Sequence, residues 1–506
     1  MGPVHKAQLF TASCFSLIAT AVCFAVVGDI MGDLKSQFVL SNEQVGYIGG
    51  AAIWGFTISI FALGPMVDVL GMRNLLFFAL ACHAAGALTM IFASNYAMLF
   101  WGGLILALGN GTVEAVCNPL VATLYPDQKT KKLNQFHVWF PGGILIGGVA
   151  SYLLGMSGGI GGLMLWQLKL CLILVPTVIY GILIIGQSFP ATERVQAGVS
   201  FGEMVAGAFV RPLFWILLAC MAVTASLELG PGRWIPAVLT AGGIPGILVL
   251  AYINGLMAVL RFSAGPVVHR LSPTGILVSS AILAGVGLFL FSYAESITMA
   301  FASATIFAIG VCYFWPTMLG VTSERVPRSG SLGMALMGGM GMLAVGVLTA
   351  PRMGAVADRY LLEELNRHPQ DTVAVLQKVV AVFPAASANE PEQFRNEIAH
   401  ATGEVQTVLT AYEEKKTLPP NTADALRSAA KNHPKSSDAT AIVTQINANL
   451  NPADNYGGRM SFRYVAPFSI FIILVFGLLY LRDRAAGGYK AESLAAEKSA
   501  NHGFDG

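Results

Sequence analysis

Three polar side chains stand at regular intervals inside one long apolar stretch. Asn110, Glu114 and Asn118 are four residues apart, so a helix through them carries all three on one face. A carboxylate in a membrane helix is costly unless it faces protein or water, and it therefore marks an ion or solute path by default. The alternative is a structural carboxyl that links neighbouring helices. We expect this face to bind a solute or protons.

A second polar pair follows a basic turn. Lys129, Lys131 and Lys132 lead into another apolar stretch, which opens with Asn134 and His137 three residues apart and so on one helical face. A histidine can exchange protons near neutral pH, although a gating or packing role is equally open here. Polar faces of two consecutive helices thus flank a positively charged loop, and we expect them to form the inner gate of a transporter.

The acid in the first stretch is suited to carrying a proton. A carboxyl group in a dry site favours its protonated form and can release the proton once the site opens to water. Protonated Glu114 could bond to Asn118 or His137, whereas the ionised form would favour a cationic partner. Asp29 is the other acid that we consider, as a substrate or second proton site, although an acid near the end of a span can also lie simply at the membrane interface.

The composition is that of a chain embedded in a lipid bilayer. Hydrophobic residues make up 55% and charged residues 11%, whereas about 25% of the residues of a soluble domain are charged. A net charge of +2 without a Lys/Arg-rich run excludes a nucleic-acid partner. No metal cluster, nucleophile motif or phosphate loop appears in the sequence, so we expect neither a cofactor nor an enzyme.

Apolar runs long enough to cross about 30 Å of hydrocarbon number twelve, which places both termini on one side. The Lys and Arg residues of the short loops gather on that side, so we expect a multi-pass protein of the plasma (inner) membrane with both termini cytoplasmic. The twelve runs are 9–33, 44–66, 73–94, 97–124, 134–155, 164–187, 211–229, 246–268, 274–294, 297–321, 331–356 and 462–481.

The chain also repeats itself in parallel. The pattern of Phe61, Gly64 and Pro65 recurs 201 residues later at Phe262, Gly265 and Pro266. This offset predicts an all-α polytopic fold of two six-helix bundles. The expected parts are a first bundle (1–187), a cytoplasmic linker (188–210), helices 7 to 11 of the second bundle (211–359), an insertion (360–459), helix 12 (460–484) and a disordered cytoplasmic tail (485–506).

The insertion differs from the rest in composition. It is rich in charged residues and proline, and apolar residues such as Val373, Leu376 and Val380 recur in it at helical spacing. We predict a small, mostly helical domain outside the cytoplasm. One use for it would be to bind an extracytoplasmic partner.

The loop from Gly64 to Arg73 carries Asp68, Gly71 and Arg73 in the order G-x-x-x-D-x-x-G-x-R. It resembles the signature loop of the major facilitator superfamily. The resemblance implies a transporter in which Asp68 and Arg73 help to hold the two halves together in the outward-open state. The alternative is a plain turn with a surface ion pair worth under about 1 kcal/mol.

Within that superfamily the central stretch resembles the fucose and hexose proton symporters. Glu114, Asn118-Pro119 and Leu133-Asn134 match the motifs of that branch, and Asp29-Ile30 matches its helix 1 motif with a one-residue gap. His137 stands where the branch carries an amide. The resemblance implies that Asp29 and Glu114 take part in proton coupling and substrate binding.

The second half adds further candidates. Glu228 and Arg233 are predicted to form an external gate, with an interfacial acid as the alternative. Asn254 and Arg261 are seven residues apart on one helical face, and we expect Arg261 to be a buried structural or coupling cation. Aromatic surfaces on which a sugar ring could stack are offered by Tyr313 and Trp315.

The sequence therefore predicts a monomeric secondary transporter that imports a sugar or a similar small polar solute with protons. Alternatives are a drug or anion carrier of the same superfamily, or a membrane-anchored sensor that acts through 360–459. An anion carrier of the nitrate type is disfavoured because the 44–66 run contains no arginine.

Overall fold

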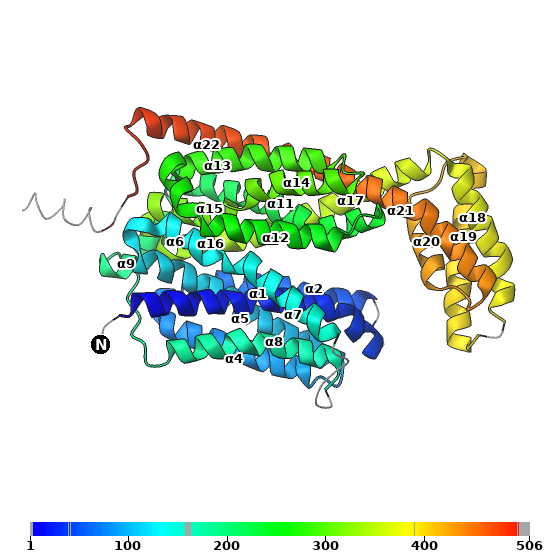
Figure 1. The fold of residues 1–506 in the computed structure, drawn as a ribbon, viewed down its shortest axis with the longest axis horizontal. Coiled ribbons are helices and arrows are strands. Elements are labelled where there is room, and N and C mark those ends of the chain that lie inside the picture. The colour runs from blue at the N-terminus through cyan, green and yellow to red at the C-terminus, as the bar shows by residue number, and fades with distance from the viewer. Residues whose placement is uncertain are drawn as a thin grey trace, which may run out of the picture.

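Helices account for all the regular structure in the described part of the chain. The computed structural model describes residues 4–38, 40, 42–156, 163–388, 390–492 and 494, and these residues contain no strand. Figure 1 shows two groups of long helices lying side by side, with a smaller helical domain beyond one end of the second group. We call that end of the molecule the cap end, and the opposite end, which carries Lys129, the Lys129 end.

The first group and the linker come from the first part of the chain. The first group contains α1 (Lys6–Gln37), α2 (Asn42–Leu63), α3 (Val67–Leu70), α4 (Met72–Ile91), α5 (Tyr96–Leu124), α6 (Lys129–His137), α7 (Trp139–Gly155) and α8 (Leu165–Ile184). The linker forms α9 (Glu193–Gln196) and α10 (Phe201–Phe209). Within the group α1 packs against α7 and α8, and α5 packs between α2 and α4.

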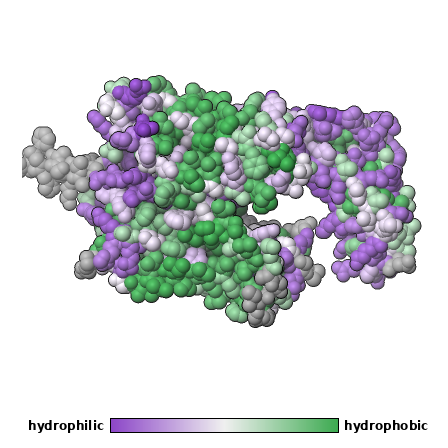
Figure 2. All heavy atoms as spheres, in the orientation of Figure 1, coloured by the Kyte–Doolittle hydropathy of each residue, from purple (hydrophilic) through white to green (hydrophobic). Residues whose placement is uncertain are grey.

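The second group contains α11 (Pro212–Ala241), α12 (Gly246–Phe262), α13 (Ala264–Phe291), α14 (Ile297–Val311), α15 (Phe314–Arg325), α16 (Gly330–Leu343), α17 (Ala350–Leu365) and α22 (Phe468–Ala485). Here α13 packs along both α14 and α22. Eleven described helical runs are long and apolar enough to cross a membrane, and α12 is a shorter apolar helix where the eighth span was expected. Figure 2 shows the apolar band that these helices present on their outer surface.

The segment between the last two spans folds around a core of its own. It contains α18 (Pro369–Ala386), α19 (Glu392–Lys415), α20 (Thr422–Lys431) and most of α21 (Ser437–Val465), packed on buried Leu376, Phe383, Val405 and Leu426. We call this segment the cap. Both predicted boundaries of the insertion, 360 and 459, fall inside continuous helices, α17 and α21, because the helical pattern does not stop at the edge of the apolar run.

Most of the predicted disordered tail lies outside the described residues. Its described part contacts the second group instead of leaving it. The Tyr489 hydroxyl donates to Glu324 Oε2 at 2.7 Å, and the Arg325 guanidinium lies 4.3 Å from the Tyr489 ring centre. The tail up to Glu492 therefore covers part of the Lys129 end.

Two helix breaks face each other across the halves. The chain turns from α6 into α7 after His137, and from α14 into α15 after Val311. A proline follows each break: Pro141 is four residues after His137, and Pro316 is four residues after Cys312. Because proline has no N–H, the carbonyl groups of His137 and Cys312 lose their usual helical donors. Both carbonyl oxygens are therefore free to accept hydrogen bonds from a side chain.

Candidate functional site

The polar residues of the first half form one buried chain of contacts. Asn118 Nδ2 donates to Glu114 Oε2 at 2.7 Å and to the Glu114 backbone carbonyl at 2.8 Å. Its Oδ1 accepts from His137 Nε2 at 2.9 Å, and that nitrogen lies 4.0 Å from Glu114 Oε2. All three side chains are at most 5% exposed. The four-residue spacing on α5 thus brings Glu114 and Asn118 into direct contact. His137, the last residue of α6 before the α6–α7 break, joins them through Asn118.

Arg261 of α12 lies between the two halves and is 2% exposed. Its Nη1 donates to the His137 carbonyl of the first half at 3.0 Å, and its Nε donates to the Cys312 carbonyl of the second half at 2.5 Å. Its Nη2 pairs with Glu228 Oε1 of α11 at 3.0 Å. The guanidinium therefore binds the two carbonyls that the prolines leave free, one in each half, and it also neutralises Glu228.

The two buried glutamates consequently differ in their surroundings. Glu228 has a direct arginine partner, whereas the neighbours of Glu114 are the Asn118 amide, the His137 imidazole and the Trp315 indole, none of which is a fixed cation. With Arg261 and Glu228 both ionised, the cluster is neutral when Glu114 is protonated and carries one negative charge when it is not. A proton is thus the simplest means of neutralising Glu114 in this dry place.

Glu228 and Arg233 do not form the predicted external gate pair. Five residues on a helix rotate by about 500°, which leaves the two side chains about 140° apart. Glu228 accordingly faces Arg261 in the centre. Arg233 instead lines a cavity of about 270 Å³ together with Asn110 and residues of α1, α2 and α5. Figure 2 shows the surface hollowed between the halves toward the cap end.

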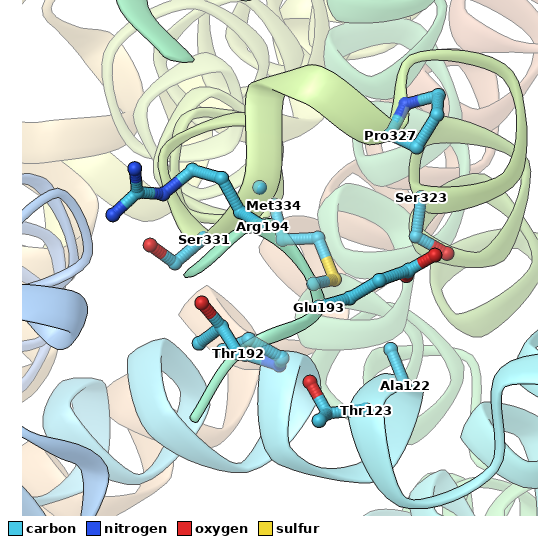
Figure 3. A pocket seen from close by; sticks show the side chains of 11 residues that line it. Ala122, Thr123, Thr192, Glu193, Arg194, Ser323, Pro327, Ser331 and Met334 are labelled. Carbon is cyan, nitrogen blue, oxygen red and sulfur yellow. The ribbon is translucent and has the colours of Figure 1, made fainter. Parts of the chain in front are cut away.

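Asp68 pairs with an arginine of the linker and not with Arg73. Its carboxylate binds Arg194 of α9 at 2.6 Å and accepts from the Thr192 hydroxyl at 2.5 Å. Arg73 lies over the Phe77 ring, 5.8 Å from its centre. Asp68 therefore binds residues of the linker. The spacing of residues within the 64–73 loop could not indicate these partners. A cavity of about 20 Å³, too small for a sugar, remains there beside Thr192, Glu193 and Arg194. Figure 3 shows the side chains that line it.

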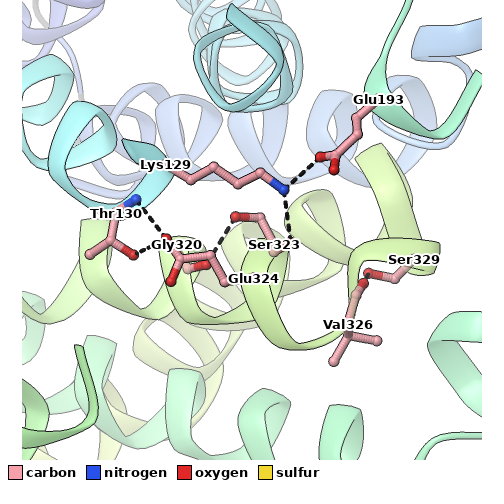
Figure 4. A network of polar contacts seen from close by, with 8 residues as sticks. All are labelled: Lys129, Thr130, Glu193, Gly320, Ser323, Glu324, Val326 and Ser329. Carbon is pink, nitrogen blue, oxygen red and sulfur yellow. Dashed lines mark hydrogen bonds and ion pairs between the residues drawn. The ribbon is translucent and has the colours of Figure 1, made fainter. Parts of the chain in front are cut away.

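The Lys129 end is closed by contacts between the halves. Lys129 Nζ pairs with Glu193 at 2.5 Å and donates to the Ser323 carbonyl at 3.4 Å, as Figure 4 shows. Thr130 donates to Glu324 Oε1 through its backbone N–H at 3.0 Å and through its hydroxyl at 2.8 Å. The basic turn of the sequence thus lies at a closed junction between α6, the linker and α15.

Asn134 extends this junction toward the centre of the molecule. Its Nδ2 donates to Thr317 Oγ1 of α15 at 3.2 Å, and its Oδ1 has no partner among the described residues. The contact joins the first turn of the fifth span to the second half. Asn134 therefore belongs to the closed end more than to the Glu114 cluster.

Asp29 and Asn110 lie apart from the Glu114 cluster. Asp29 pairs with Lys169 at 2.5 Å and accepts from Ser151 at 2.7 Å, so it links α1, α7 and α8. Asn110 accepts from His83 Nε2 at 2.9 Å. Sequence reasoning did not assign Lys169 or His83 to these contacts, because the partners lie on other helices. The geometry gives Asp29 a structural ion pair in place of a position beside Glu114.

The remaining candidates, Asn254, Tyr313 and Trp315, differ in the contacts that their polar groups make. Asn254 donates to the Leu250 carbonyl of its own helix at 2.9 Å, and the Tyr313 hydroxyl donates to the Leu260 carbonyl at 2.8 Å. Trp315, at the start of α15, is buried against Gly338 and Gly341 of α16, and its Nε1 has no partner among the described residues. The Trp315 indole lies beside the Glu114 carboxyl, so this residue belongs to the central cluster.

Comparisons with known proteins point to one family. The model described as Major Facilitator Superfamily matches residues 9–350. The putative niacin/nicotinamide transporter NiaP of Bacillus subtilis (strain 168) is 21% identical over 71% of this chain and 90% of its own. The gentisate transporter of Corynebacterium glutamicum is 21% identical over 68% and 79%, respectively. A solved structure of FucP, the E. coli fucose:proton symporter, in the outward conformation is 20% identical over 69% of this chain and 92% of that one, with a TM-score of 0.58.

Proposed function

Because the chain belongs to the major facilitator superfamily, we propose that this membrane transporter imports a sugar or a similar small polar solute together with protons. The family confirms the resemblance seen in the sequence. The finer proposal is supported chiefly by one observation: Glu114 is buried at the junction of the halves without an arginine or lysine partner among the described residues. Its proton then decides whether the central cluster is neutral.

The charge of the cluster favours a neutral solute there. Arg261 already donates to two carbonyls and a carboxylate, so its guanidinium has little left to offer an anion. An anionic solute beside ionised Glu114 would be repelled, whereas a hydroxyl-rich solute could bond to the carboxyl groups of Glu114 and Glu228 and to the Trp315 indole beside them. In the proposal, a solute and a proton enter together from the cap end.

Alternating access requires the Lys129 end to open afterwards. The pairs that would separate are Lys129–Glu193, Thr130–Glu324 and Asn134–Thr317. The basic loops support an orientation with the Lys129 end in the cytoplasm and the cap outside it. On this orientation the described conformation faces outward, both termini are cytoplasmic and the transporter works as a monomer in the plasma (inner) membrane.

Proton coupling is tested by the pH outside cells. In lightly buffered, de-energised cells that express the protein, a panel of monosaccharides and polyols is added while the external pH is recorded. We expect a solute-specific alkalinisation that is lost in Glu114→Gln, whereas Asp29→Asn, which alters the acid outside the cluster, keeps it. Labelled-solute exchange in Glu114→Gln should persist, because exchange needs no net proton movement.

Two outcomes would contradict the proposal. Uptake without any pH change in the wild type would exclude proton symport. An unaltered pH change in Glu114→Gln would exclude Glu114 as the carrier. In both cases the protein must be shown in the membrane by immunoblot.

A second candidate is a carrier of small organic acids. One observation favours it, the unpaired Arg233 in the cavity at the cap end. Two relatives are described as carriers of niacin/nicotinamide and of gentisate, and the acid forms of such compounds carry one carboxylate on one ring.

A further inference from the structure

We propose that Arg233 and the cavity at the cap end form a binding site for the carboxylate of a small organic acid with an apolar body. The inference rests on the proposed transport function and develops its second candidate, a carrier of small organic acids, in place of a sugar carrier. It depends on a cavity, on one cation and on the distribution of polar groups around both.

The cavity lies where the two halves meet. Its walls come from α1, α2 and α5 of the first half, and Arg233 is the lining residue from the second half. Its volume of about 270 Å³ is at the small end of ligand pockets, which run from about 300 to 1,000 Å³. A ligand of one ring with a short polar group fits this space.

The walls are mainly apolar. Phe24, Val27, Met31, Ile48, Ile53 and Leu106 all contribute to the lining. Asn110 is the one amide among the lining residues, and its Oδ1 already accepts from His83. A sugar would leave most of its hydroxyl groups without partners here, at a cost for each buried group. Binding of an apolar ring would instead be favourable, because it removes apolar surface from water.

Arg233 has no protein partner within the described residues. In the same group of helices Arg261 makes three polar contacts, whereas no hydrogen bond or ion pair joins Arg233 to any described group. Its side chain is exposed to the hollow between the halves although α11 is apolar enough to span a membrane. Because this guanidinium is exposed in the hollow and no described group pairs with it, it is free to bind an anion that enters the cavity.

The guanidinium selects the class of ligand. Its planar fork matches a carboxylate with two parallel hydrogen bonds, which are stronger than bonds to a neutral oxygen. The nearest acid on its own helix, Glu228, is engaged with Arg261 on another face. A monocarboxylate would therefore neutralise Arg233 while its apolar body filled the cavity.

Binding at this site would also act on the conformation. The carboxylate would be held by α11 and the ring by α1, α2 and α5, so the ligand would join the two halves at the cap end. A ligand shifts a conformational equilibrium only by contacts that differ between the states. Contacts to both halves at once provide that difference, because they are complete only when the cap end closes.

The test uses the purified full-length protein in nanodiscs and isothermal titration calorimetry. The probes are benzoate and cyclohexanecarboxylate, with benzamide and cyclohexanemethanol as matched neutral compounds. We expect both acids to bind and both neutral compounds to bind at least about tenfold more weakly, as expected for the loss of a charge-assisted pair. Arg233→Gln should weaken the acids by about tenfold or more and leave the neutral compounds unchanged.

Two variants separate this inference from folding and from proton coupling. Arg233→Lys keeps the charge without the fork and should retain part of the affinity, and all variants are compared by size-exclusion profile. Gly477→Val on α22, where a Cβ meets nothing within 4 Å, should bind the acids like the wild type, and calorimetry measures this binding independently of any pH response of cells. Equal binding of acids and neutral compounds, no binding of either acid, or full affinity in Arg233→Gln would each overturn the inference and leave the proposal for Glu114 standing.

Discussion

At the scale of single residues, Arg261 shows how a buried charge can become a structural link between two halves. It binds Glu228 and two carbonyls that Pro141 and Pro316 leave without helical donors. A buried cation of this kind is retained where it satisfies several acceptors at once. The same residue therefore connects the acid of α11 with the breaks next to the Glu114 cluster.

Replacing Arg261 should lower the stability of the protein, because Glu228 would lose its cationic partner. Arg261→Gln leaves Glu228 charged and unpaired in a dry site, and we expect a loss of stability of about 3–5 kcal/mol. Adding Glu228→Gln removes the stranded charge and should restore part of that loss. Denaturant unfolding of the purified variants in detergent measures both values. If the double variant is as unstable as Arg261→Gln, the charge pair is not the cause of the loss.

Some contacts between single residues could be predicted from their spacing in the sequence, and others could not. The contact of Asn118 with Glu114 follows from helical periodicity, whereas its contact with His137 depends on how the consecutive helices α5 and α6 pack. Glu228 was given the wrong partner and Asp68 none in particular, since their partners, Arg261 and Arg194, lie 33 and 126 residues away. Such pairs depend on helix packing. One overlooked signal was present, the two prolines placed four residues after carbonyls that need a donor.

At the scale of helices, the apolar runs were predictable and their ends were not. Hydropathy alone locates the spans, because about 20 apolar residues are needed to cross a bilayer. It does not show that α17 and α21 continue beyond the membrane into the cap, since a helix can change its environment without a break. It also cannot reveal which faces touch, and the close crossing of α6 and α15 is an example.

Gly320 makes that crossing possible. A Cβ at this position would lie 2.3 Å from Thr130 Oγ1, so any side chain forces α6 and α15 apart. We expect Gly320→Val to disfavour closure of the Lys129 end and to lower transport by at least about tenfold, the effect of a shift of about 1.4 kcal/mol. Gly477→Val on α22, where a Cβ meets nothing within 4 Å, is the matched control. Initial rates of uptake measure the effect, and equal rates for the two variants would rule out a role for the crossing.

At the scale of the whole molecule, the cap belongs to the second half. It continues from α17 and α21, and α21 is joined to the second half by Asn455, which donates to the Val238 carbonyl at 2.8 Å, and by Arg459, which pairs with Glu295 at 2.8 Å. The cap is therefore attached to the second half by two continuous helices, a hydrogen bond and an ion pair. We expect it to move with the second half as the cap end opens and closes.

The opposite end depends on charge contacts between α6, the linker and α15. Lys129 is 3% exposed in its pair with Glu193, and it also donates to the Ser323 carbonyl. Lys129→Glu would place two carboxylates together and weaken closure. Exchanging both charges, as Lys129→Glu with Glu193→Lys, restores the attraction without restoring the original sequence. A double-mutant comparison therefore isolates the pair from other effects of either change.

A cysteine introduced at Thr123, which lines the small cavity at that end, reports the opening, with the native cysteines replaced. We expect maleimide labelling in inside-out vesicles to rise several-fold in Lys129→Glu and to return toward the starting rate in the double exchange, since like charges in a partly buried site cost more than an exposed pair. If the double exchange labels as fast as Lys129→Glu, the pair does not hold this end closed, and the Thr130–Glu324 contact would have to carry the closure alone.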